Sequence, residues 1–344
     1  MRSRRADGVT GKRIITAPVE TTGDGEAILP VAAPSLSVSG RRWNPGDFVF
    51  KHLTLFFSLV LLSLVFLMGY EMYRGSAITL EKFGWEFLTT STWDPVMDEY
   101  GALPFIYGTV VSSLVALLIA LPLGLGVAIF LAELSPAWLE RPLSFLVELL
   151  AAIPSIVYGL WGIFVLVPWL RLNVQPLLST HLGFLPLFKG PAYGFGMLAA
   201  GLILAVMVLP IIASISRDVL RAVPNTQREA ALALGGTRWE TTKIVLGTAK
   251  SGILGATLLG LGRAVGETMA VTMVIGNRAD ISASLFNPAY SMASVIANEF
   301  AEATTPAYTS ALIEIALVLF VVTIILNAAA RLIVWGVTRK FRTA

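Results

Sequence analysis

Two charged residues stand in an apolar stretch of the chain, and their types and spacing suit anion chemistry. Arg263 and Glu267 lie four residues apart in a run rich in Gly, Ala, Val and Met. On a helix this spacing places both side chains on one face, within reach of each other. A guanidinium offers several N–H donors to an anion, and a carboxylate can hold it when no anion is present. We expect the pair either to line an anion pathway or to form a static ion pair that fixes helix register.

The composition indicates that this pair belongs to a membrane protein. Hydrophobic residues make up 56% of the 344 residues and charged residues 14%, whereas soluble domains carry roughly 25% charge. The mean hydropathy is +0.76. The chain has no cysteine, which excludes disulfides and thiolate chemistry. A helix crosses a bilayer with about 20 apolar residues, and six stretches satisfy this: residues 53–70, 104–131, 143–169, 194–214, 251–276 and 311–336.

These stretches predict an all-α polytopic membrane protein with six transmembrane helices. Residues 1–50 lack an apolar run and are expected to form a disordered, basic cytoplasmic tail. Residues 51–72 form the first transmembrane helix and residues 73–103 an external, periplasmic interfacial loop. Residues 104–340 form the transmembrane core, with a cytoplasmic loop at residues 217–250. The basic residues of the tail either are simply solvated or contact anionic lipid headgroups: Arg2, Arg4, Arg5, Lys12, Arg13, Arg41 and Arg42.

Lysine and arginine placement predicts the orientation, because cytoplasmic loops of membrane proteins carry an excess of both. With a cytoplasmic N-terminus, 18 of the 25 basic residues lie inside. Only five lie outside, namely Arg74, Lys82, Arg171, Lys189 and Arg278. Both termini are therefore expected in the cytoplasm.

The external loop before the second span carries aromatic residues among acidic ones. They are Trp85, Phe87, Trp93 and Tyr100. Aromatic side chains favour the water–lipid boundary. We expect an interfacial segment that anchors the first two spans, with contact to an external partner as the alternative.

The cytoplasmic loop contains signals for two helices. Thr226 and Glu229 fit a capping box, Gly235 with Gly236 predicts a stop, and Thr237 with Glu240 fits a second capping box. Ala230 and Ala231 are helix formers behind the first box. A short helix of this kind either docks in a groove of another protein or lies on the membrane surface.

Other residues of the spans predict packing and boundary positions. Gly262 and Gly266 form a GxxxG face, which predicts close approach of another helix. Glu133 is interpreted as a boundary charge and Glu148 as a paired or snorkelling carboxylate near Arg141. Glu314 is expected to reach the outer interface.

Glu229, Ala230, Ala231 and Gly235 resemble the EAA motif of ABC importer permeases. That resemblance implies that the helix containing Thr226 and these four residues couples the membrane subunit to an ATPase. The family motif usually continues to a proline, and this sequence has Val245, Leu246 and Gly247 instead.

Residues 261–277 closely resemble the phosphate-specific permeases, and within them the C-type subunit. Residues 93–96, 101–105, 148–155 and 158–162 also resemble this C-type subunit. The resemblance covers residue 83 to the C-terminus. It implies a type I, MetI-like bundle in a bacterial inner membrane, and roles in transport for Arg263 and Glu267. It also implies an A-type permease partner, two ATP-binding subunits that hold ATP and Mg, and an external phosphate-binding protein.

Two other functions remain open from the residues alone. One is a permease for another oxyanion, such as molybdate, sulfate or a phosphonate, because a single guanidinium does not distinguish tetrahedral anions. The other is an ion-coupled carrier, for which inverted repeats would be expected, and we find no internal repeat. The sequence contains no phosphate-binding P-loop, no metal-ligand spacing and no catalytic set. We expect a transport subunit without its own ATPase site or cofactor, embedded in lipid and without nucleic acid partners.

Overall fold

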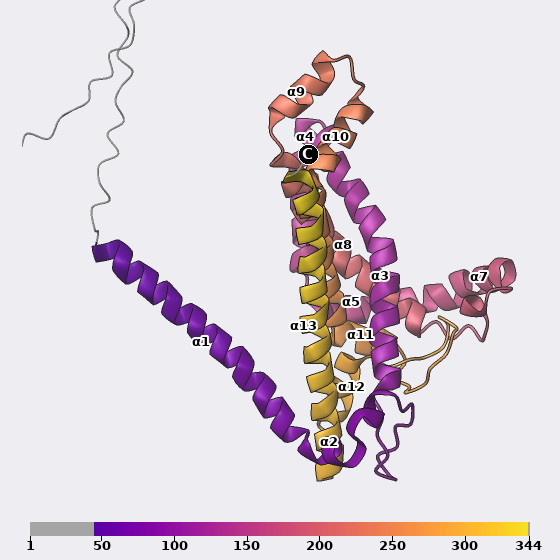
Figure 1. The fold of residues 1–344 in the computed structure, drawn as a ribbon. Coiled ribbons are helices and arrows are strands. Elements are labelled where there is room, and N and C mark those ends of the chain that lie inside the picture. The colour runs from indigo at the N-terminus through magenta and orange to yellow at the C-terminus, as the bar shows by residue number, and fades with distance from the viewer. Residues whose placement is uncertain (1–44, 343–344) are drawn as a thin grey trace, which may run out of the picture. The chain divides into compact units, whose positions relative to one another are not determined.

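The computed structural model describes residues 45–342, and these residues form helices with longer non-helical segments at residues 89–102, 189–196 and 275–291 (Figure 1). Among them the only β pairing is in two isolated bridges, Asp94 with Glu99 and Gly276 with Ala289. Six helical segments are long and apolar enough to cross a membrane, which confirms the predicted number. They are Gly46–Gly75, Leu103–Leu134, Ser155–Leu182, Met197–Arg221, Arg238–Val265 and Pro306–Gly336.

The chain divides into two units, Met1–Leu61 and Leu62–Ala344. The described part of the first unit is the beginning of helix α1 (Pro45–Gly75), and every residue from 46 to 61 in it is exposed. The predicted tail and its basic residues up to Arg42 lie outside the described residues. Residues 45–50, which we assigned to the tail, are instead the first turns of α1, so that part of the prediction is wrong.

Helix α8 (Met197–Arg221) is the central helix of the second unit. Within its apolar window 67% of the residues are buried, and it packs against α3 (Leu103–Ile129) and α10 (Arg238–Val265). Small residues allow the close approach that membrane helices need. A Cβ on Gly124 of α3 would lie 3.1 Å from Ile212, and one on Gly260 of α10 would lie 2.7 Å from Val208.

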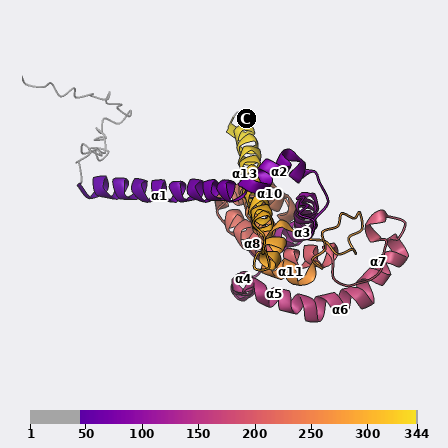
Figure 2. The same cartoon turned by 90° about the horizontal axis from the view of Figure 1, so that it is seen from below.

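The third span starts later in the chain than predicted. Residues 137–152 form a separate helix, α4 (Ala137–Ala152), and the span begins at Ser155. Pro154 causes the break, because proline disfavours helical backbone in the preceding residue, and Ile153 is extended with ψ 130°. Helices α5 (Ser155–Trp161), α6 (Val167–Trp169) and α7 (Gln175–Leu182) then follow one curved path, joined by π-helical turns (Figure 2).

The fifth span is displaced in the opposite direction. Helix α10 begins at Arg238, inside the predicted cytoplasmic loop, and ends at Val265. Gly266 caps its C-terminus, and a short helix, α11 (Met269–Val274), follows the break. The predicted continuous helix over residues 251–276 is therefore wrong, since it is interrupted near Gly266.

Three of the four aromatic residues of the external loop, Phe87, Trp93 and Tyr100, form a packed cluster. Helix α2 (Ala77–Phe83) and a short 3-10 helix (Gly84–Leu88) give this loop structure. Phe87 and Tyr100 are 0% and 1% exposed, whereas Trp85 is 85% exposed. The cluster packs on α12 (Met292–Glu299) and α13 (Pro306–Arg342), where Glu299 accepts hydrogen bonds from Trp93 and Tyr308.

Burial raises the pKa of Tyr100 to about 12, and a hydrogen bond to Asp98 adds to this effect. The hydroxyl therefore stays protonated even in mildly alkaline solution, and it donates to the Asp98 carboxylate at 3.1 Å. This cluster lies at the end of the bundle opposite α9 (Asn225–Ala233), as the positions of α2, α12 and α9 show (Figure 1).

Two glycines of α3 provide a test of this packing. A Cβ on Gly108 would clash with the backbone carbonyl oxygen of Tyr290, whereas a Cβ on Gly126 would have no described atom within 4 Å. We predict that Gly108→Ala destabilises the protein by about 1–3 kcal/mol, as overpacking does. Gly126→Ala should be neutral or slightly stabilising, because alanine favours helix.

The measurement is the thermal unfolding midpoint of the detergent-purified protein. Equal midpoints for the two variants would show that α3 does not approach Tyr290 as closely as described.

Candidate functional site

Helix α9 carries the residues that we predicted to couple the protein to an ATPase. It follows Pro224, whose extended backbone (ψ 137°) precedes the first helical residue, and it ends before Gly235. Gly235 has φ +82°, a left-handed conformation that glycine adopts without strain. Its N–H and that of Gly236 donate to Leu232 and Ala231, at 2.9 and 3.0 Å, which closes the helix.

The first predicted capping box is wrong. Pro224 occupies the cap position of α9, no side chain caps this helix, and Thr226 is its second residue. The second box is confirmed, because the Thr237 hydroxyl accepts from the Glu240 N–H at 3.3 Å. The Glu240 carboxylate in return accepts from the Thr237 N–H at 2.7 Å. This box starts α10 after the glycine pair.

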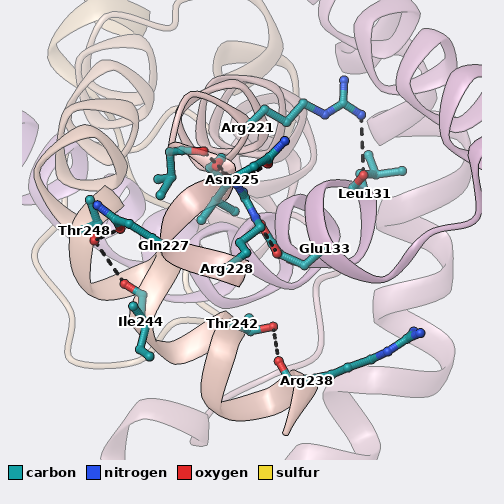
Figure 3. A network of polar contacts seen from close by, with 12 residues as sticks. Leu131, Glu133, Arg221, Asn225, Gln227, Arg228, Arg238, Thr242, Ile244 and Thr248 are labelled. Carbon is teal, nitrogen blue, oxygen red and sulfur yellow. Dashed lines mark hydrogen bonds and ion pairs between the residues drawn. The ribbon is translucent and has the colours of Figure 1, made fainter. Parts of the chain in front are cut away.

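The EAA residues lie on different sides of α9. Glu229 and Ala230 are exposed, Ala231 is 7% exposed, and Leu234 just beyond the helix is 91% exposed. Figure 3 shows how α9 is attached on its inner side, where Thr248 of α10 donates to Gln227 at 2.9 Å. The helix thus presents a carboxylate and apolar groups to the outside.

Arg228, which the sequence analysis did not single out, makes the most contacts in this region. Its guanidinium donates to Glu133 at 2.7 and 3.2 Å, from Nη2 and Nε (Figure 3). It also donates to the backbone carbonyls of Leu220 and Val223, at 2.8 and 2.6 Å, and to Asn225. Glu133, interpreted as a boundary charge, does lie at the end of the second span, and its largely buried side chain is the ion-pair partner of Arg228.

Two further ion pairs link α4 to α8 in the same region. Glu148 pairs with Arg217 at 2.9 Å, which confirms the paired carboxylate, with Arg217 and not the nearby Arg141 as its partner. Glu140 pairs with Arg221. Acidic residues at 133, 140 and 148 and arginines at 217, 221 and 228 recur at intervals of one to two helical turns. The seven-residue interval from Glu133 to Glu140 matches that from Arg221 to Arg228, but the eight-residue interval to Glu148 does not match the four-residue interval to Arg217, so the spacing alone does not indicate this pairing.

Arg263 and Glu267 are brought together at a helix end. Arg263 lies in the last turn of α10, and its guanidinium is 3.3 Å from the Glu267 carboxylate. Glu267 follows Gly266 in the break, and its carboxylate also accepts from the Ala270 N–H of α11 at 3.4 Å. The side chain of Glu267 is 4% exposed and that of Arg263 is 48% exposed. The Glu267 carboxylate is therefore buried and held by the N–H of α11, while the guanidinium of Arg263 is exposed enough for an anion to contact it.

Gly262 and Gly266 do not make the predicted close helix contact within the described chain. No described side chain lies within 4 Å of a Cβ built on Gly262, and the nearest atom to one on Gly266 is the carbonyl oxygen of Gly262. The close contacts of α10 are instead at Gly252 and Gly260, where a Cβ would lie 2.4 Å from Val219 and 2.7 Å from Val208. Gly260 is on nearly the opposite side of the helix from Gly262. Gly262 instead lines an open groove between α10 and α13, together with Leu258, Val265, Thr323 and Asn327.

The prediction that Glu314 reaches the outer interface is wrong, because the residue is buried in α13 and only 2% exposed. No group of three or more His, Asp or Glu residues gathers as metal ligands between residues 45 and 342.

The capping boxes give a matched pair of variants. Thr237→Ala removes the cap of α10 and should destabilise its first turn by about 1 kcal/mol, which would speed amide exchange over residues 238–242. Thr226→Ala removes no cap and should leave exchange in α9 unchanged. Hydrogen exchange with mass spectrometry checks both, and faster exchange in Thr226→Ala alone would contradict the assignment.

Comparison with known proteins places the chain in a family. Residues 120–339 match the family described as "Binding-protein-dependent transport system inner membrane component". The phosphate transport system permease protein PstC of Mesorhizobium japonicum is 47% identical over 308 residues, covering 88% of this chain and 94% of the relative. PstC of Pasteurella multocida is 44% identical, covering 86% of this chain and 93% of the relative.

Solved structures show the same fold at lower sequence similarity. A chain of the inward-facing MetNI methionine ABC transporter is 19% identical with a TM-score of 0.52, covering 72% of this chain and 99% of that chain. A chain of a bacterial ABC transporter involved in the import of alginate is 16% identical with a TM-score of 0.54. The match covers 84% of this chain and 99% of that chain. The expected MetI-like permease fold is confirmed. The chain belongs to the inner membrane components of binding-protein-dependent transport systems and, within them, to the PstC phosphate transport permeases.

Proposed function

We propose that this chain forms the transmembrane pathway of an ATP-driven inorganic phosphate importer together with a second, A-type permease. An external phosphate-binding protein delivers phosphate, and two ATP-binding subunits, which hold ATP and Mg, drive the cycle. The observation that carries the substrate class is the 47% identity to a phosphate transport permease over nearly its whole length. This chain contributes the path, and its partners contribute the nucleotide chemistry.

Coupling to the ATP-binding subunits takes place at α9. The supporting observation is a short helix that exposes Glu229 and Ala230, with the apolar Leu234 at its end, at one end of the bundle. An apolar side chain that is 91% exposed beside a carboxylate suits a protein groove. With both termini cytoplasmic, as the basic residues predict, α9 faces the compartment that holds ATP.

The pathway includes Arg263 and Glu267. Glu267 is held by its contact to α11 and balances Arg263 while the path is empty. An incoming phosphate competes for the guanidinium, and the exposed side of Arg263 makes this contact accessible. A ligand shifts the equilibrium between the inward-open and outward-open states only by its different affinity for each. The separation of Arg263 from Glu267 would therefore have to be easier in one of these two states than in the other.

Two alternative functions can be separated from phosphate import by experiment. A permease for molybdate, sulfate or a phosphonate would use Arg263 identically, and competition between anions for uptake separates these substrates. An ion-coupled carrier would need an ion gradient and no ATPase. Uptake that requires the ATP-binding subunits in reconstituted vesicles would exclude the carrier.

Reversing the charge at Glu229 tests the coupling site. Glu229→Lys places a cation on the docking side of α9 and should reduce phosphate uptake at least about tenfold, because like-charge or unpaired contacts at an interface cost several kcal/mol. The control Glu86→Lys changes an exposed carboxylate at the opposite end and should be normal. Both variants should reach the membrane in equal amounts. Normal uptake by Glu229→Lys would remove α9 from the coupling mechanism.

Neutralising Arg263 tests the pathway. Arg263→Gln should lower uptake at least about tenfold, since a charged hydrogen bond contributes roughly 1.5–3 kcal/mol. Arg263→Lys, which keeps the charge, should retain more activity. The double variant Arg263→Gln with Glu267→Gln distinguishes the two roles of the pair. It stays inactive if Arg263 binds phosphate, and it recovers uptake if the pair only fixes helix register. Uptake of radiolabelled phosphate by vesicles that contain the assembled complex measures each.

A further inference from the structure

One guanidinium holds together the ends of three segments that are distant in sequence. Arg228 lies in α9 and donates to Leu220 and Val223, at the end of α8 and just after it. It also donates to Glu133, 95 residues away, in the π-helical turn Phe130–Leu134 that ends α3. Arg228 thus links the proposed coupling helix to two membrane-spanning helices at once.

The contact between Arg228 and Glu133 is a bidentate, charge-assisted ion pair. Two N–H groups of Arg228 face the two carboxylate oxygens, at 2.7 and 3.2 Å, and the side chains are 18% and 7% exposed. Bidentate, charge-assisted hydrogen bonds are short and directional, so they fix the geometry as well as contributing free energy. Removing one partner leaves the other charge buried without compensation. The pair is therefore a stiff connection between α9 and α3.

On its N-terminal side α9 is joined to α8 by the three residues Ala222, Val223 and Pro224, whereas its C-terminal connection is less constraining than the contact to Glu133. On its C-terminal side α9 joins α10 through Gly235 and Gly236, and Gly235 has the left-handed φ of +82°. Two consecutive glycines allow many backbone directions. On its inner side the cross-contact to α10 is the exposed hydrogen bond between Thr248 and Gln227. None of these contacts reaches α3.

The neighbouring ion pairs connect other helices. Arg217 with Glu148 and Arg221 with Glu140 both join α8 to α4. Among the ion pairs of the described residues, the pair of Glu133 and Arg228 is the one that reaches α9. Glu140 and Arg221 are also more exposed, at 31% and 38%.

We propose that Glu133 is a positioning residue for transport, which transmits displacement of α9 directly to the end of α3 through Arg228. The inference rests on the proposed coupling function of α9. When the ATP-binding subunits displace α9, the pair makes the ends of α3 and α8 move with it as one body. Without the pair, α9 follows the ATP-binding subunits while α3 lags, so ATP is hydrolysed with less phosphate moved.

The test measures phosphate uptake and ATP hydrolysis in the same vesicles, with the complete complex and the phosphate-binding protein. Glu133→Gln keeps the shape of the side chain and removes its charge. We expect complex assembly and ATP hydrolysis to persist, and the phosphate transported per ATP to fall roughly tenfold, the scale of a lost charged hydrogen bond. Arg228→Gln should lower this ratio as well, and the double variant should be no worse than the more impaired single variant. Glu140→Gln is the matched control, and its ratio should stay within about twofold of the unchanged protein.

A pair that only supports the fold would lower assembly and ATP hydrolysis together and leave the ratio unchanged, and this result would overturn the proposal. Additive losses in the double variant would also contradict it. If Glu133→Gln does not assemble, Glu133→Asp, which keeps the charge on a shorter side chain, takes its place. Failure of both to assemble would assign the pair to assembly and end the proposal.

The experiments distinguish a failure of the proposed coupling function from a failure of transmission through Glu133. If Glu229→Lys supports normal uptake, α9 is not the coupling site at all. If Glu229→Lys is inactive while Glu133→Gln keeps a normal ratio, α9 docks the ATP-binding subunits and only transmission through Glu133 is wrong.

Discussion

A charged side chain that leaves water needs a partner of opposite sign, and the buried arginines of the described chain meet this constraint, whereas Glu314, 2% exposed in α13, forms no ion pair with another described residue. Arg228 and Arg217 are largely buried, and each is matched by a glutamate from a distant segment. Glu267, 4% exposed, is matched by Arg263 and by a backbone N–H of α11. The arginines near the start of α9 are thus the points at which separate helices are joined, while the apolar surfaces between them are free to face lipid or another subunit.

The two paired sites differ in how firmly each partner is held. At the α9 end, both members of the Glu133–Arg228 pair are mostly buried, and Arg228 has three further acceptors. At the α10–α11 break, Glu267 is held and Arg263 is half exposed. A rigid connection at one end and an exchangeable contact at the other are what a transporter needs. Force must be transmitted without loss where ATP acts, and an anion must be able to replace a carboxylate where it passes.

The sequence predicted the features that depend on local pattern. Apolar length predicted six spans, and the spacing of Thr237 and Glu240 predicted the start of α10. It failed where single residues interrupt an apolar run: Pro154 separates α4 from the third span, and Gly266 ends the fifth early. Within the described chain Gly262 lines a groove, so the helix contact predicted for it is not made there. Glu133 and Arg228 are 95 residues apart, so only the packing of α3 against α8 brings them together.

The proposed coupling requires that α9 faces the compartment that contains ATP, and the cysteine-free chain allows a direct test. Val96 in the external segment and Leu234 after α9 are 87% and 91% exposed, so a single cysteine at either position is open to a membrane-impermeant maleimide. In spheroplasts that lack the ATP-binding subunits, we expect labelling of Val96→Cys without permeabilisation and of Leu234→Cys only after it. Labelling of Leu234→Cys in sealed spheroplasts would place α9 outside and contradict the mechanism.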